Sequence, residues 1–209
     1  MNRLAVIALL GMIVAPCTHA ATLNNDPVAH VAFTLGLTAG GSSIATAKYT
    51  NGDSTTIHGG GLVQLGFGVY FHKSSFPASA LLTINYHVDS TSARNGNIQF
   101  DRWPLELVGY YHINDQWRVG AGIRHVMNPR LRIDFDEQPS TTVDYEDTDS
   151  PIFEVAWGQG WGRNNYWIGL RYVHETLKAQ RVSYDGITTT DVDHTDDGSH
   201  FGVMLHYAF

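Results

Sequence analysis

Hydrophobic and polar residues alternate one by one in eight segments of the chain. In the last segment, residues 201–209, the residues on the apolar parity are Phe201, Val203, Leu205, Tyr207 and Phe209. Because successive side chains of a strand point to opposite faces, this pattern predicts a strand with one apolar face. Seven earlier segments repeat it: residues 31–37, 63–71, 82–88, 103–111, 117–123, 153–157 and 166–172. No segment shows helical spacing of comparable strength, so the chain is predicted to be all-β.

The connections between these segments alternate between short and long. Three short ones are predicted to be turns, at residues 72–79, 114–115 and 162–165. The four long ones are residues 40–58, 90–97, 128–150 and 183–199. Short turns at one end and long loops at the other are typical of an antiparallel up-and-down transmembrane β-barrel, with periplasmic turns and extracellular loops. Eight strands would place both ends of the barrel domain on the side of the short turns.

The distribution of charge separates a membrane barrel from a soluble, lipocalin-like one. The central stretches of the apolar parity carry no Asp, Glu, Lys or Arg. The opposite parity is rich in glycine and collects the charged residues Arg102, Glu106, Arg118, Arg124, Glu154, Arg171 and Glu175. Eight strands leave room inside only for packed side chains, and buried charges must pair. We therefore expect these seven residues to form an interior ion-pair network that plugs the barrel, with a polar pore as the alternative.

Aromatic residues and one proline refine this picture. Rings are expected in two belts at the membrane interfaces. Those near the short turns are Phe71, Tyr111, Trp117, Trp157, Trp161, Tyr166 and Tyr207, and those toward the loops are Tyr86, Trp103, Phe153, Tyr172 and Phe201. Pro104 cannot donate a ladder hydrogen bond, so a bulge, or a ladder that begins just after it, is expected there.

The first 20 residues have the features of a secretory signal peptide. A basic start is followed by an apolar run, residues 4–15, and by a small-residue cleavage site that ends at Ala20. Residues 21–209 then form one β-barrel domain. Cleavage would remove Cys17, so no disulfide and no thiolate zinc site are expected, and Pro16 argues against lipidation at Cys17. The net charge of −7 and the scattered basic residues argue against nucleic acid as a partner.

Several of these segments resemble a known family. Residues 103–111 leading through residues 117–124 look like a recurring strand–turn–strand unit, and residues 166–172 look like the usual seventh strand. The chain resembles the small eight-stranded outer-membrane barrels of the OmpA/OmpX type. The resemblance implies a monomer in the outer membrane of a Gram-negative bacterium, in contact with membrane lipids and lipopolysaccharide. It also implies that Leu205, Tyr207 and Phe209 form a C-terminal signal for the barrel assembly machinery.

The histidines on the lipid-facing parity are candidates for catalytic chemistry. His125 has the lipid-facing parity, and some eight-stranded barrels are lipid A deacylases that use a His-x-Ser pair there. In this chain the serine position is Met127, so no hydroxyl is available as a nucleophile. His174 also falls on the outer parity and is expected to be interfacial.

The acidic third and fourth loops are expected to be solvated, with sharing of divalent cations with lipopolysaccharide phosphates as the alternative. No metal site and no cofactor are predicted. The expected role is non-catalytic, either structural in the envelope or in surface interaction. An outer-leaflet lipid-modifying enzyme and a narrow channel for small solutes remain alternatives.

Overall fold

The structure is a computed structural model that describes residues 28–48, 54–73, 76–93, 96–136, 138–159, 165–190 and 192–209. The predicted signal peptide, residues 1–20, lies outside the described residues. None of the described residues belongs to a helix long and apolar enough to cross a membrane.

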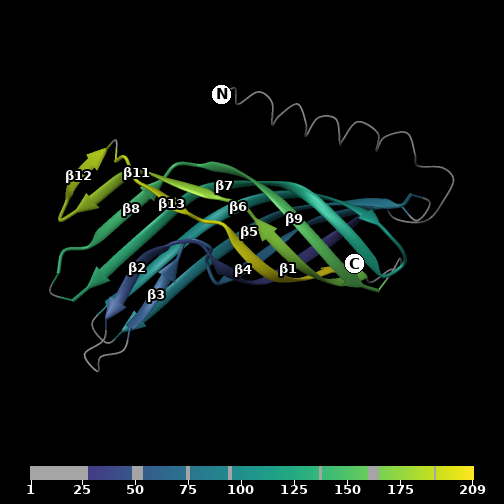
Figure 1. Cartoon of the computed structure of the whole chain (residues 1–209), viewed down its shortest axis with the longest axis horizontal. Helices are drawn as coiled ribbons and strands as arrows, with labels where there is room; N and C mark the ends of the chain where they lie inside the picture. Colours follow the sequence, from purple (N-terminus) through teal and green to yellow (C-terminus); the bar gives the residue numbers. More distant parts are fainter. Residues whose placement is uncertain are drawn as a thin grey trace.

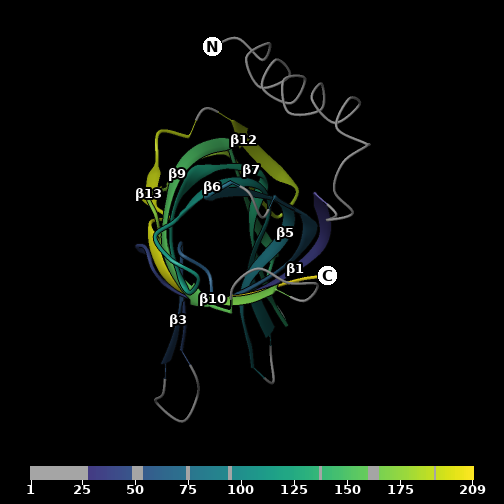
Figure 2. The same ribbon diagram turned by 90° about the vertical axis from the view of Figure 1, so that its right-hand side faces the viewer.

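Eight antiparallel strands form a closed barrel, as the alternation predicted. They are β1 (Ala29–Gly40), β4 (Val63–His72), β5 (Ala78–Ala93), β6 (Gly96–His112), β7 (Trp117–Phe135), β9 (Thr148–Gly158), β10 (Asn165–Val173) and β14 (His200–Ala208). Each pairs with the next in this order, and β1 pairs with β14 to close the ring (Figure 2). Closure leaves these eight strands with no free edge within the barrel wall.

The two parities face opposite sides of the barrel wall, which confirms the assignment of faces. Leu170 on the outside is 63% exposed, whereas its neighbour Arg171 and Trp167 are buried inside. Glycines on the inner parity make room for long side chains: a Cβ on Gly169 would clash with Oε1 of Glu154. Because a continuous apolar exterior is unfavourable in water and suits hydrocarbon, the fold is that of a transmembrane β-barrel.

Aromatic rings gather in two belts on the exterior. Near the short turns, Trp117 lies opposite Trp157, and Tyr166 lies opposite Tyr207. Toward the long connections, the ring centroids of Tyr86 and Trp103 are 5.0 Å apart. In the same belt, Tyr172 pairs with Phe201 at 4.8 Å. The belts are therefore where the sequence placed them; Trp161 lies outside the described residues.

The long connections contain further strands, which the sequence pattern did not predict. These are β2 (Ser43–Lys48), β3 (Ser54–His58), β8 (Thr141–Tyr145), β11 (Thr176–Tyr184), β12 (Ile187–Thr190) and β13 (Thr195–Asp197). Strand β8 pairs with the C-terminal part of β7 and with β11, so the barrel sheet extends beyond the closed barrel wall. Strands β2 and β3 form a separate hairpin. All lie at one end of the barrel, here called the loop end (Figure 1). The opposite end, with the short turns and the C-terminus, is called the turn end.

A second apolar core fills the loop end. It comprises Ala47, Ile57, Ile98, Phe100, Leu131, Tyr145, Leu177 and Ala179, all buried. The core depends on a register shift between β6 and β7 at Asp101–Trp103, opposite Asn128, whose φ is +50°. On the turn-end side of the shift the even-numbered Arg124 points inward, and on the loop-end side the odd-numbered Leu131 points inward. One extra residue thus reverses the faces of β7 and turns its aliphatic side chains into this core.

Pro104 interrupts the sheet less than expected. Strand β6 runs through it without a break, and the ladder to β5 is missing only between Leu105 and Arg102. The pairing of β5 with β6 resumes in the same register on both sides, so the ladder does not begin after the proline. The expected bulge is present two residues away, on the β7 side.

Candidate functional site

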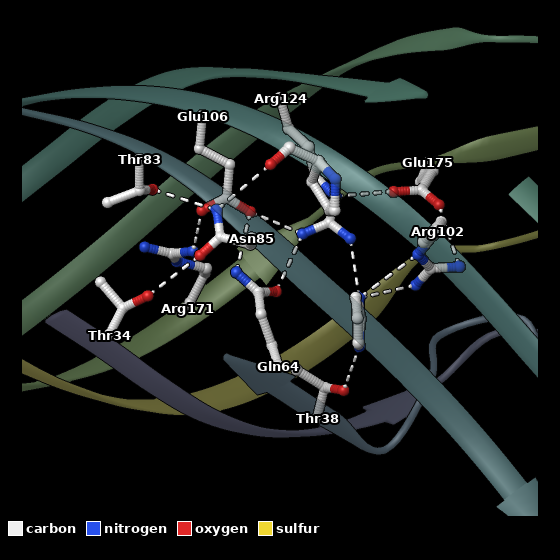
Figure 3. A network of polar contacts seen from close by, with 12 residues as sticks. Thr34, Thr38, Gln64, Thr83, Asn85, Arg102, Glu106, Arg124, Arg171 and Glu175 are labelled. Carbon is white, nitrogen blue, oxygen red and sulfur yellow. Dashed lines mark hydrogen bonds and ion pairs between the residues drawn. The ribbon is translucent and has the colours of Figure 1, made fainter. Parts of the chain in front are cut away.

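The centre of the barrel interior is organised around Glu106 on β6. Its two carboxylate oxygens accept hydrogen bonds from Nη1 of Arg124 at 2.6 Å and Nη1 of Arg171 at 2.7 Å (Figure 3). Arg124 is the direct cross-strand neighbour of Glu106, and Arg171 is that of Glu154, to which it pairs at 2.8 Å. Antiparallel register therefore sets both pairs, and Arg171 joins them across the lumen.

The network continues toward the loop end through Glu175. This carboxylate accepts from Nε of Arg124 at 3.0 Å and lies 3.2 Å from Nη1 of Arg102. Six residues thus form one chain of alternating charge: Glu154, Arg171, Glu106, Arg124, Glu175 and Arg102. Each of their side chains is at most 2% exposed. Since a charge buried alone is costly, the alternation lets each compensate its neighbours.

Neutral polar residues complete the network, and the sequence reading did not single them out. Gln64 donates to Glu106 at 3.1 Å and accepts from Arg124 at 2.9 Å. Nδ1 of His87 lies 2.7 Å from Nη2 of Arg124 and 3.0 Å from Nη2 of Arg102. Because guanidinium groups only donate, this nitrogen is the acceptor, which leaves Nε2 to donate to the Thr38 hydroxyl at 2.8 Å. Gln64, His87 and Thr38 all lie on the inward-facing parity of their strands, and this is the signal in the sequence that could have identified them.

Arg118 departs from the expected network. Its guanidinium lies over the ring of Trp167, 4.7 Å from the centroid, and its Nη1 donates to the Tyr70 hydroxyl at 3.3 Å. Within the described residues, no carboxylate oxygen lies within 4.0 Å of it. Arg118 therefore belongs to the interior but not to the ion-pair chain.

Apolar and aromatic layers enclose the ion-pair chain from both ends. Toward the loop end, Arg102 stacks on Phe100 of the second core, 5.0 Å from its ring centroid. Toward the turn end, Trp167 packs against Tyr70 and His206, each at 4.9 Å between ring centroids. The charges are thus held between two packed layers rather than along an open water-filled lumen.

His125 has an acidic partner on the barrel exterior. Its Nδ1 lies 2.8 Å from Oδ1 of Asp149, the residue opposite it on β9, and both side chains are exposed. Sequence order could not show this partner, because register brings it from 24 residues away. The serine position of the deacylase pattern remains Met127, on the neighbouring outward position, so the pair lacks a nucleophilic hydroxyl.

A serine does lie beside the second exterior histidine, His174. Nδ1 of His174 is 3.1 Å from Oγ of Ser199. The same hydroxyl accepts from the backbone N–H of Glu175 at 3.2 Å, and Asp197 bonds the Ser199 backbone rather than the imidazole. Hydrogen bonds from the hydroxyl and the backbone N–H of Ser199, and then the charge of His174, lower the pKa of the Asp197 carboxyl. No described carboxylate orients the His174 ring, so the arrangement lacks the third member of a triad.

The polar residues at the loop end serve the second core. Asp196 accepts from the Tyr145 hydroxyl at 3.1 Å and lies 3.3 Å from Nε2 of His194. Burial, and then the charge of Asp196, raise the pKa of Tyr145, so this hydroxyl remains a donor. Across the described part of the chain, no three His, Cys, Asp or Glu side chains are grouped so as to hold a metal ion.

Comparison with known proteins finds no matching family model and no matching curated protein. Three solved structures are similar in fold. Neisserial surface protein A is 9% identical, with a TM-score of 0.48, covering 88% of this chain and 98% of that one. The translocator domain of the autotransporter NalP from Neisseria meningitidis is 11% identical, with a TM-score of 0.47 and coverages of 98% and 96%. The outer membrane protein AlkL is 18% identical, with a TM-score of 0.48 and coverages of 91% and 94%.

Proposed function

We propose that the protein is a non-catalytic β-barrel of the bacterial outer membrane that carries a folded β-structure on the cell surface. The observation that supports this proposal most is the second apolar core at the loop end. Closing an eight-stranded barrel needs only short loops, yet here three of the four long connections contribute six further strands. A rigid extracellular structure of this kind suits surface interaction or envelope support better than transport.

The location and partners follow from the same features. The apolar exterior between two aromatic belts would contact membrane lipids, and the loop end would lie among the lipopolysaccharide head groups. Leu205 and Tyr207 lie on the exposed face of β14, and Phe209, directly after the strand, is exposed as well, as a signal read by the barrel assembly machinery would require. Since the eight strands close on themselves, the barrel is proposed to function as a monomer.

One alternative rests on a specific contact. The pairing of His174 with Ser199 near the loop-end belt would favour an outer-leaflet lipid hydrolase if the hydroxyl were free to attack an ester. The hydroxyl is instead held by the backbone of Glu175, and no carboxylate supports the imidazole. We therefore keep the non-catalytic role as the main proposal.

Lipid A mass spectrometry separates the two functions. We expect cells that express the protein to show the lipid A profile of cells carrying the empty vector, with the protein recovered in the outer-membrane fraction. A Ser199→Ala variant, which removes the hydroxyl that lies 3.1 Å from Nδ1 of His174, should give the same profile. Loss of an acyl chain with the wild-type protein, but not with this variant, would contradict the proposal and identify a hydrolase.

A further inference from the structure

The turn-end half of the barrel interior carries a positive charge that no described side chain neutralises. Four arginines and three glutamates of the predicted network lie inside the barrel, a difference of one positive charge. The ion-pair chain uses three of the arginines and all three glutamates, so the excess falls on Arg118. The other buried carboxylates, Asp89, Asp101 and Asp196, lie toward the loop end and have partners there. Asp89 accepts from the backbone N–H of His58 at 3.1 Å, Asp101 pairs with Arg132, and Asp196 accepts from the Tyr145 hydroxyl.

Arg118 is also incompletely hydrogen-bonded. It is 2% exposed, and its Nε–H has no partner. Its contact with Trp167 is a cation–π interaction, which attracts the guanidinium but does not satisfy its N–H groups. A buried charged donor without an acceptor is unfavourable by several times the value of an ordinary hydrogen bond.

A second, poorly satisfied donor lies at the same place. The indole Nε1–H of Trp167, the residue on which Arg118 stacks, is buried and has no acceptor in good hydrogen-bond geometry. Its one weak contact is with the Tyr110 hydroxyl, which itself donates to Glu154 at 3.0 Å. The surrounding side chains are Tyr70, Ser79 and His112, all of which can donate. Around Arg118, donors and positive charge therefore meet with no described carboxylate oxygen within 4.0 Å of the guanidinium.

We infer that Arg118 and Trp167 form a binding site for one small monovalent anion, such as chloride, inside the turn-end half of the barrel. The anion would accept from Nε of Arg118 and Nε1 of Trp167 and neutralise the excess charge. Only a small ion is consistent with this packed region, in which Trp167 lies 4.9 Å from both Tyr70 and His206 between ring centroids. The site is distinct from the Glu106 network, whose charges compensate one another.

Urea unfolding of the purified barrel in detergent micelles tests the site, at constant ionic strength in sodium chloride or sodium gluconate. Gluconate is too large to enter this region. We expect the wild-type midpoint to be higher in chloride by about 0.5–1 M urea, because a ligand that binds only the folded state stabilises it. Arg118→Met should abolish this difference, and Trp167→Phe, which keeps the ring but removes the N–H, should reduce it.

Arg132→Gln is the matched control, because it removes an exposed guanidinium that pairs with Asp101 at 2.8 Å and should leave the chloride effect unchanged. Bromide-soaked crystals of the wild-type protein give a second test that does not depend on variants. An anomalous peak within hydrogen-bond distance of Nε of Arg118 would support the site. Equal midpoints in the two salts, a chloride effect that survives Arg118→Met, or a water molecule without anomalous signal at this position would overturn it.

Discussion

Glu106→Gln is expected to lower the free energy of unfolding by about 3–5 kcal/mol, the usual cost of removing one partner from a buried ion pair. Glu106 holds Arg124 and Arg171 at 2.6 and 2.7 Å, and neither arginine has access to solvent. A neutral amide of the same size would leave the positive charges of both guanidinium groups with less negative charge beside them. Guanidinium chloride unfolding of the two proteins in lipid vesicles, followed by tryptophan fluorescence, measures the change.

Glu146→Gln provides the matched control for this prediction. Glu146 pairs with Lys178 at 3.0 Å, but both side chains are about half exposed. Exposed pairs contribute about 0.2–1 kcal/mol, so this change should shift the unfolding midpoint only slightly. Equal effects of the two substitutions would show that the interior charges are hydrated, and the packed network would then be wrong.

Leu170→Arg is expected to destabilise the inserted barrel by about 2–4 kcal/mol, as found for arginine on the lipid face of barrels near the bilayer midplane. Leu170 is 63% exposed and lies between Val155 and Val203, inside the two aromatic belts. In hydrocarbon, the guanidinium would have no water and no partner there. Folding into vesicles, scored by the shift of the folded band on electrophoresis without boiling, reports the loss.

Ile187→Arg separates membrane exposure from exposure to water. Ile187 is 71% exposed, which is close to Leu170, but it belongs to the hairpin of β11 and β12 at the far side of the loop end. This substitution should leave folding into vesicles within about 0.5 kcal/mol of the wild type, because surface changes away from packed regions have small effects. If Leu170→Arg were as harmless as Ile187→Arg, the exterior of the strands would not face lipid.

The barrel itself could be predicted from the sequence because its signal is local and repeated. Alternation with a period of two marks each strand, and the same parity marks the face, so Leu205 and Leu170 were assigned to the exterior without knowledge of register. The candidate charges could be placed inside for the same reason. The ion-pair partners of these charges could not be predicted, since the contact of Arg171 with Glu106 crosses the lumen and joins residues 65 positions apart.

The second core at the loop end could not be predicted, because the inward face of β7 there depends on one local irregularity. The register shift opposite Asn128 reverses the faces of β7, so an uninterrupted parity rule would have placed Leu131 on the wrong side. Strand β8 is stabilised by pairing with β7, and β11 by pairing with β8, rather than by a strong alternation of their own. The isolated position of Arg118 was likewise hidden, because parity gives the side of the wall and not the neighbours.

Conductance across planar lipid bilayers tests the central claim most directly, namely that the barrel interior is closed by the ion-pair chain and the packed layers on either side of it. Wild-type protein, with insertion verified in the same membranes, should give no channel events above the bilayer leak in 1 M potassium chloride. Discrete, reproducible current steps from the wild-type protein would contradict the closed interior and favour a narrow channel instead.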